Sequence, residues 1–129
     1  MIKSFLKEKQ GFTLIEIVAV LAIIGVMAVM LVPSIDIASN RTKDTKMLSD
    51  LVTIDSAVKL YQFETGSLPE SIEELKGTYI PSKTYKDTQG NPFTYTPSTT
   101  TAGTTYTLTG KNTNGDIVSS DGTKEKASA

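Results

Sequence analysis

The chain has 129 residues and a formal net charge of −1, which leaves room for one small domain beside an apolar segment. It contains no cysteine and no histidine, so disulfides, thiolate zinc sites and every catalytic arrangement built on these residues are excluded. We therefore expect no enzymatic activity, no catalytic residue, no metal site and no cofactor. The sequence has no basic cluster beyond its first ten residues, which argues against nucleic acid as a partner.

The N-terminal region is a polar, basic leader followed by an apolar stretch from Phe12 to Val32. About 20 apolar residues is the length that spans a bilayer, and it is too long for one core helix in so small a domain. A secretory signal peptide has a shorter apolar region with a small-residue cleavage site, whereas this stretch ends at Pro33 without one. A single-pass anchor is compatible with the sequence, because the leader lysines would hold the N-terminus in the cytoplasm.

One charged residue, Glu16, interrupts the apolar stretch. A carboxylate at the centre of a membrane span costs about 2.5–3.5 kcal/mol on insertion scales, and a plain anchor gives no reason for it. The segment Gly11-Phe12-Thr13-Leu14-Ile15-Glu16 resembles the class III signal of type IV pilins and the related pseudopilins. The resemblance continues through the apolar helix to Pro33 and becomes weak after about residue 66.

This resemblance implies a processed N-terminus. A prepilin peptidase would remove residues 1–11 by cutting after Gly11, and the new terminal residue, Phe12, would then be N-methylated. Cleavage creates an α-amine one helical turn from Glu16, and opposite charges attract strongly in a low dielectric, whereas either one alone carries a large desolvation penalty. In a filament, the resemblance implies that Glu16 pairs with the Phe12 amine of a neighbouring subunit, so both are expected assembly residues.

We expect one long N-terminal helix in two parts. Residues 12–33 form the transmembrane and assembly helix, and residues 34–66 form an amphipathic helix. Pro33 has no backbone donor and crowds the preceding turn, so we expect a kink or local melting over residues 29–33.

An apolar stripe on the amphipathic part predicts the face that packs on the domain core. Asp55 and Lys59 form a favourable pair four residues apart, and Gly66 supplies the C-terminal stop. The stripe recurs at four- and three-residue spacing and consists of Met47, Leu51, Ile54, Val58 and Tyr61.

Residues 67–120 are expected to form a short helix and a small sheet. Residues 70–75 fit one or two helical turns. Alternating segments predict three antiparallel strands laid on the helix stripe, at residues 93–96, 106–109 and 116–119. Residues 121–129 have the composition of a polar, frayed tail. The expected fold class is α+β and pilin-like, with a long N-terminal helix packed on a small antiparallel β-sheet.

The segment Asp87–Tyr95 is similar to the loop that precedes the sheet in type II secretion major pseudopilins, but Thr88-Gln89 stands where those often carry Pro-Trp. Those pseudopilins bind calcium through a C-terminal loop. Asp116 and Asp121 could supply hard oxygen ligands here, but they are also ordinary turn residues, and we assign no metal site.

The sequence and this resemblance together predict a structural subunit of a type IV pilus-like filament, either a pilin or a major pseudopilin. Such a filament would serve surface pili, protein secretion or DNA uptake. The expected partners are further copies of the chain, the prepilin peptidase and methylase, an inner-membrane assembly platform, and the membrane before assembly. The protein would be a single-pass inner-membrane protein before assembly and an extracellular or periplasmic filament afterwards. The alternative is a membrane-anchored extracellular binding module that never polymerises.

Overall fold

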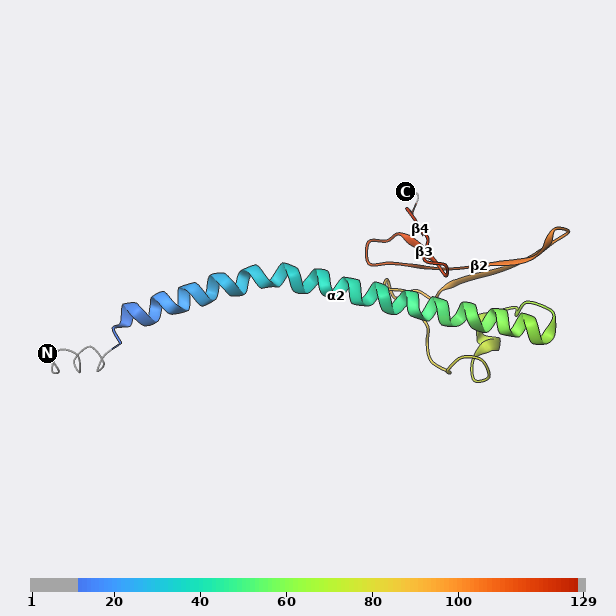
Figure 1. Cartoon of the computed structure of the whole chain (residues 1–129), viewed down its shortest axis with the longest axis horizontal. Helices are drawn as coiled ribbons and strands as arrows, with labels where there is room; N and C mark the ends of the chain where they lie inside the picture. The colour runs from blue at the N-terminus through green and yellow to red at the C-terminus, as the bar shows by residue number, and fades with distance from the viewer. Residues whose placement is uncertain (1–11, 128–129) are drawn as a thin grey trace. The chain divides into compact units, whose positions relative to one another are not determined.

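The computed structural model describes residues 12–127, so the expected leader and Gly11 lie outside the described residues. The contacts within the chain divide it into two compact units, Met1–Ser39 and Asn40–Ala129. In chain order, the elements are α2 (Leu14–Thr65), the short 3-10 helix η1 (Ile72–Leu75), β1 (Thr94–Thr100), β2 (Gly103–Lys111), β3 (Ile117–Ser119) and β4 (Lys124–Glu125) (Figure 1).

The described part of the first unit is the N-terminal portion of α2. Every residue from 12 to 39 is exposed in the isolated chain, although most of them are apolar. The helix is long and apolar enough to cross a membrane, judged by length and composition. It continues through Pro33, so the local melting expected over residues 29–33 is not found. The kink at Pro33 stays a prediction.

The core of the second unit forms on one face of α2, as the apolar stripe predicted. Met47, Leu51, Ile54 and Val58 are at most 3% exposed, and Tyr61 packs against them at the edge. The helix ends at Thr65, where Gly66 adopts φ +78° and its N–H donates to the carbonyl oxygen of Gln62. The side chains that complete the core are Ala57, Leu75, Ile80, Tyr85, Phe93, Leu108 and Val118.

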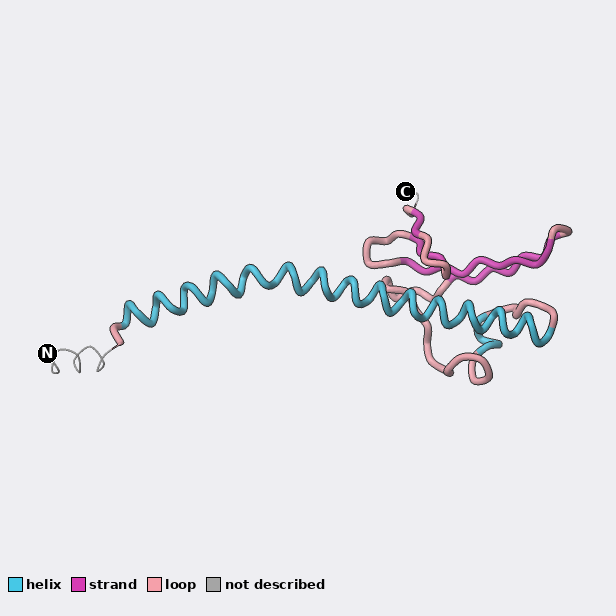
Figure 2. The backbone as a smooth tube through the Cα atoms, viewed as in Figure 1, coloured by secondary structure: helices cyan, strands magenta, loops and turns pink. Residues whose placement is uncertain are grey.

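The sheet is an antiparallel meander in the order β1-β2-β3-β4. Figure 1 shows it along one side of the C-terminal part of α2, with the loop that carries η1 along another. The α+β class and the three predicted strands are therefore confirmed. The β1–β2 hairpin is longer than predicted (Figure 2). Its threonine-rich outer half is exposed.

The description of residues 121–129 as a frayed tail is wrong for two of them. Lys124 and Glu125 form β4 and pair with Val118 and Ile117. The physical reason is local turn chemistry, because the Asp121 carboxylate accepts hydrogen bonds from the backbone N–H and the hydroxyl of Thr123. This turn reverses the chain without any hydrophobic pattern that a sequence reading could detect.

A buried carboxylate fixes the loop before β1. Asp87 is 9% exposed, and its Oδ1 accepts the N–H groups of Gln89 and Asn91, each at 2.9 Å. Its Oδ2 accepts the Lys111 N–H at 3.1 Å, which ties the loop to β2. Beside it, the ring of Phe93 lies 2.7 Å from where a Cβ of Gly110 would stand, so this position has no room for a side chain.

Candidate functional site

The candidate site begins at the N-terminus of α2. The backbone N–H of Glu16 donates to the carbonyl oxygen of Thr13 at 3.0 Å and, at a long 3.4 Å, to its hydroxyl. Thr13 therefore caps the helix, and Glu16 stands three residues later, in the pattern of a capping box. A carboxylate in the first turn also interacts favourably with the helix dipole. Helix capping is a second reason for an acid at this position, and Thr13-Leu14-Ile15-Glu16 contains its sequence signal, which was not used in the prediction.

Phe12 and Glu16 lie at the same helix end, four residues apart, and Phe12 is 81% exposed. The ion pairs within residues 12–127 join Lys59 to Asp55, Lys76 to Glu73 and Lys83 to Asp50. The Glu16 carboxylate therefore has no cationic partner in the part of the chain that the structure describes. It is an acid on an apolar helix with no charge to neutralise it there.

Apolar side chains are also exposed in the C-terminal part of α2. In the second unit Val52 and Leu60 are each 47% exposed, and Phe63 is 88% exposed. At about 100° per residue these three side chains lie on the side of the helix opposite the core stripe. An exposed apolar helix face of this kind is typical of a surface that another molecule covers.

The amphipathic part of α2 is tied to the sheet by a polar network centred on Asp55. The predicted pair with Lys59 is confirmed at 2.7 Å, and Oδ1 of Asp55 also accepts the hydroxyls of Tyr106 and Ser120. Desolvation opposes the charged form of Asp55, but hydrogen bonds from Lys59, Tyr106 and Ser120 outweigh it and lower the pKa of this carboxyl. Desolvation and the bond to Asp55 raise the pKa of Tyr106. This network stabilises the domain, and its geometry offers no reacting group.

The two aspartates considered as calcium ligands serve separate turns. Asp116 accepts the side-chain amide of Asn112 at 3.3 Å, whereas Asp121 binds Thr123. No group of three or more His, Cys, Asp and Glu side chains that could hold a metal ion occurs within residues 12–127.

The arrangement of the helix and the sheet is that of a known class of α+β proteins. A long exposed apolar helix joined to a small antiparallel sheet is the layout of pilin-like α+β proteins. The prokaryotic N-terminal methylation motif matches residues 6–32, which include Gly11, Phe12 and Glu16. The chain thus carries the class III prepilin signal of type IV pilins and pseudopilins. Comparison with curated proteins and with solved structures gave no match.

Proposed function

We propose that the protein is a structural subunit of a type IV pilus-like filament, a pilin or major pseudopilin that serves surface pili, protein secretion or DNA uptake. The observation that carries this proposal is the methylation motif over residues 6–32, whose described residues from Leu14 onward belong to an exposed apolar helix. In this proposal the helix crosses the inner membrane before assembly. Neighbouring helices replace the lipid after assembly, in an extracellular or periplasmic filament.

Processing prepares the subunit for this transfer. Prepilin peptidase cuts between Gly11 and Phe12, which removes the leader with its three lysines, and the Phe12 amine is then methylated. Loss of the leader removes the charges that hold the N-terminus in the cytoplasm, so an assembly platform can extract the helix at lower cost.

The new α-amine gives Glu16 a partner of opposite charge. An unpaired carboxylate in an apolar environment is strongly unfavourable, and it becomes tolerable when an ion pair and hydrogen bonds compensate its desolvation. Because the amine of one subunit pairs with Glu16 of the next, docking neutralises both groups and fixes the register between helices.

The test begins with intact mass spectrometry of the membrane-extracted and sheared-filament fractions. The proposal expects a mature chain that starts at Phe12 with one added methyl group, present in both fractions. A full leader on assembled filaments would contradict the processing step. A processed chain that remains in the membrane and never enters the sheared fraction would favour the anchored binding module instead.

A further inference from the structure

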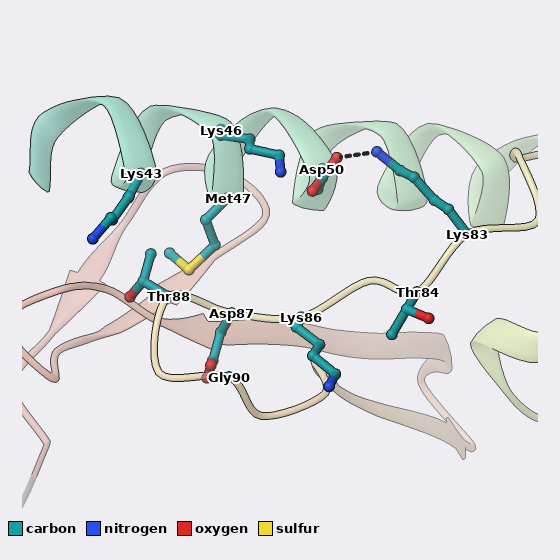
Figure 3. A pocket seen from close by; sticks show the side chains of 10 residues that line it. All are labelled: Lys43, Lys46, Met47, Asp50, Lys83, Thr84, Lys86, Asp87, Thr88 and Gly90. Atoms are coloured by element: carbon teal, nitrogen blue, oxygen red, sulfur yellow. Dashed lines mark hydrogen bonds and ion pairs between the residues drawn. The ribbon is translucent and has the colours of Figure 1, made fainter. Parts of the chain in front are cut away.

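The second unit contains a cleft of about 530 Å³ between α2 and the loop that precedes the sheet. Figure 3 shows the side chains that line it and the two segments from which they come. Four of them are lysines, of which Lys43 and Lys46 belong to α2, and Lys83 and Lys86 to the loop. The sequence analysis found no basic cluster beyond the leader, because these lysines come from segments about 40 residues apart and meet only in the folded domain.

Most of the positive charge of this basic cleft is not neutralised inside the domain. Of its two acids, Asp50 is paired with Lys83 at 3.1 Å, and Asp87 is occupied by backbone N–H groups of its own loop. Lys43, Lys46 and Lys86 are exposed, and none of them takes part in the ion pairs found among residues 12–127. The cleft is therefore a solvent-exposed surface with a net positive charge.

The same domain carries a complementary surface at the C-terminal end of α2. Its centre is the pair Tyr61 and Tyr79, whose rings meet edge to face at 5.7 Å. Glu64 accepts the Tyr79 hydroxyl, and Glu74 accepts the backbone N–H of Glu70. Desolvation, followed by the charges of Glu74 and Glu70, raises the pKa of Tyr61. We call Glu64, Glu70 and Glu74 the glutamate surface.

We propose that the basic cleft of one subunit receives the glutamate surface of a second copy of this chain in the assembled filament. This inference rests on the proposed function, because copies that polymerise through the same helix end lie parallel and staggered. At a rise of about 1.5 Å per residue, Lys46 and Glu64 are separated by about 27 Å along α2. A neighbour displaced by that distance along the filament has its glutamate surface at the axial level of the cleft, and rotation of the neighbour about the filament axis must turn the two surfaces toward each other.

The charges set register more than affinity. Each exposed ion pair contributes little to the affinity between subunits, because solvent and salt screen it. Two surfaces of opposite charge nevertheless disfavour every axial position of the neighbour that brings like charges together. The pairing of Glu16 with the Phe12 amine sets the register at the helix ends, and the contact at the cleft adds a second constraint on the axial position of the domains.

Engineered cysteines test the contact directly, because the chain has none of its own. Subunits carrying Lys46→Cys and Glu70→Cys together should form a ladder of disulfide-linked multimers when filaments are oxidised, and none as detergent-extracted monomers. The matched control combines Glu70→Cys with Lys124→Cys instead of Lys46→Cys. Lys124 lies on exposed β4, outside the cleft lining, so this control should give no ladder.

Charge exchange provides a second arm with a readout in filament yield. Neither the Lys46 nor the Glu70 side chain contacts another part of the domain through a hydrogen bond or ion pair within residues 12–127, so changing either should leave the monomer folded. Lys46→Glu should reduce sheared filaments several-fold, and Glu70→Lys in the same chain should restore most of the yield.

The outcomes separate this inference from the function on which it rests. Wild-type filaments with no Lys46–Glu70 ladder and no rescue overturn the contact and leave the filament subunit intact. An absence of wild-type filaments overturns both. Nucleic acid that binds purified filaments through Lys46, while Lys46→Glu leaves filament yield unchanged, would also overturn the contact, because the cleft would then serve another polyanion.

Discussion

At the scale of single residues, the chain contains two kinds of carboxylate that deserve comparison. Asp55 is surrounded by three donors from its own domain, so its charge is satisfied as soon as the domain folds. Glu16 has no such partner among the described residues, and in the proposed filament the Phe12 amine of a neighbouring subunit supplies the opposite charge. The first kind of acid stabilises a fold, and the second kind makes an assembly dependent on its partner.

Glu16→Ala should separate insertion from assembly. As a membrane protein the variant should insert at least as well as the wild type, because an acid has been removed from the apolar segment that enters the lipid. As a filament subunit it should incorporate poorly, because the neighbouring Phe12 amine loses its partner. Membrane level, leader removal and sheared filament yield are measured on the same cultures.

Glu16→Gln is the matched control, since it keeps size and hydrogen bonding but not charge. Few filaments from both variants, with normal insertion, would support the pairing. Wild-type yield from both would refute it, and the position at the capped first turn would then leave helix capping as the role of Glu16.

The hydrogen bonds and ion pair of Asp55 predict that the stability of the domain falls at acidic pH. Its pKa is lowered in the folded state from an ordinary value of 3.8, so its contribution is present above that value and is lost as the pH falls through the lower folded value. Asp55→Ala should lower the free energy of unfolding at neutral pH by about 1–3 kcal/mol. Denaturant titrations across this range should show a shallower acid dependence in the variant, and an unchanged slope would show that Asp55 does not control it.

At the scale of elements, the periodic patterns were the reliable part of the sequence. The stripe on α2 fixed the buried face because a helix repeats every 3.6 residues whatever it packs against. The alternating segments located β1, β2 and β3 for a similar reason. What the sequence could not reveal were contacts between distant positions, such as Tyr106 with Asp55, and the basic cleft. These contacts depend on how distant segments pack in three dimensions, and a local sequence period does not reveal that.

Leu51→Ala should destabilise the domain by about 2–5 kcal/mol, because Leu51 is completely buried and the substitution leaves a cavity. The measurement uses a fragment that begins near residue 34, which we expect to be a folded monomer, since none of the described residues before Met47 belongs to the core. Val52→Ala, on the exposed face of the same helix, is the control and should change stability little. A loss below about 0.5 kcal/mol for Leu51→Ala would mean that the stripe does not form the core.

Gly110→Ala should destabilise the same fragment by about 1–3 kcal/mol, because the added methyl group overlaps the Phe93 ring. The double variant with Phe93→Leu should recover part of the loss, since a smaller side chain opens the space. Thermal unfolding of Gly110→Ala, Phe93→Leu and the double variant measures these effects. An unchanged stability of Gly110→Ala would show that the Phe93 ring moves aside easily.

At the scale of the whole molecule, the two units have opposite relations to solvent. Residues 12–39 expose apolar side chains that need lipid or other helices, whereas the second unit buries its own core. The N-terminal segment therefore depends on surroundings that the second unit does not need. In the proposed pathway, removal of the leader, the only segment that processing removes, controls when the N-terminal segment leaves the membrane.

Gly11→Val should block that release, because the peptidase must accommodate a residue without a side chain at the cut. The unprocessed chain should accumulate in the membrane with its leader lysines and yield no sheared filaments. Immunoblots for the size shift, with Ile2→Val as a control in the leader away from the cut, measure the effect. Normal processing of Gly11→Val would contradict the assigned cleavage position.

The exposed edge of the sheet, strand β1, needs protection against amyloid-like aggregation. β1 is a seven-residue strand with one side unpaired, and such an edge is a template on which strands of other chains can add and begin amyloid-like growth. Pro97 lies in the middle of β1, where it offers no N–H to an incoming strand and its ring obstructs approach. A protein that is concentrated many-fold along a fibre needs this protection more than a dilute one does. In the proposed filament, the proline therefore disfavours growth through the sheet edge and leaves subunit addition to the helices.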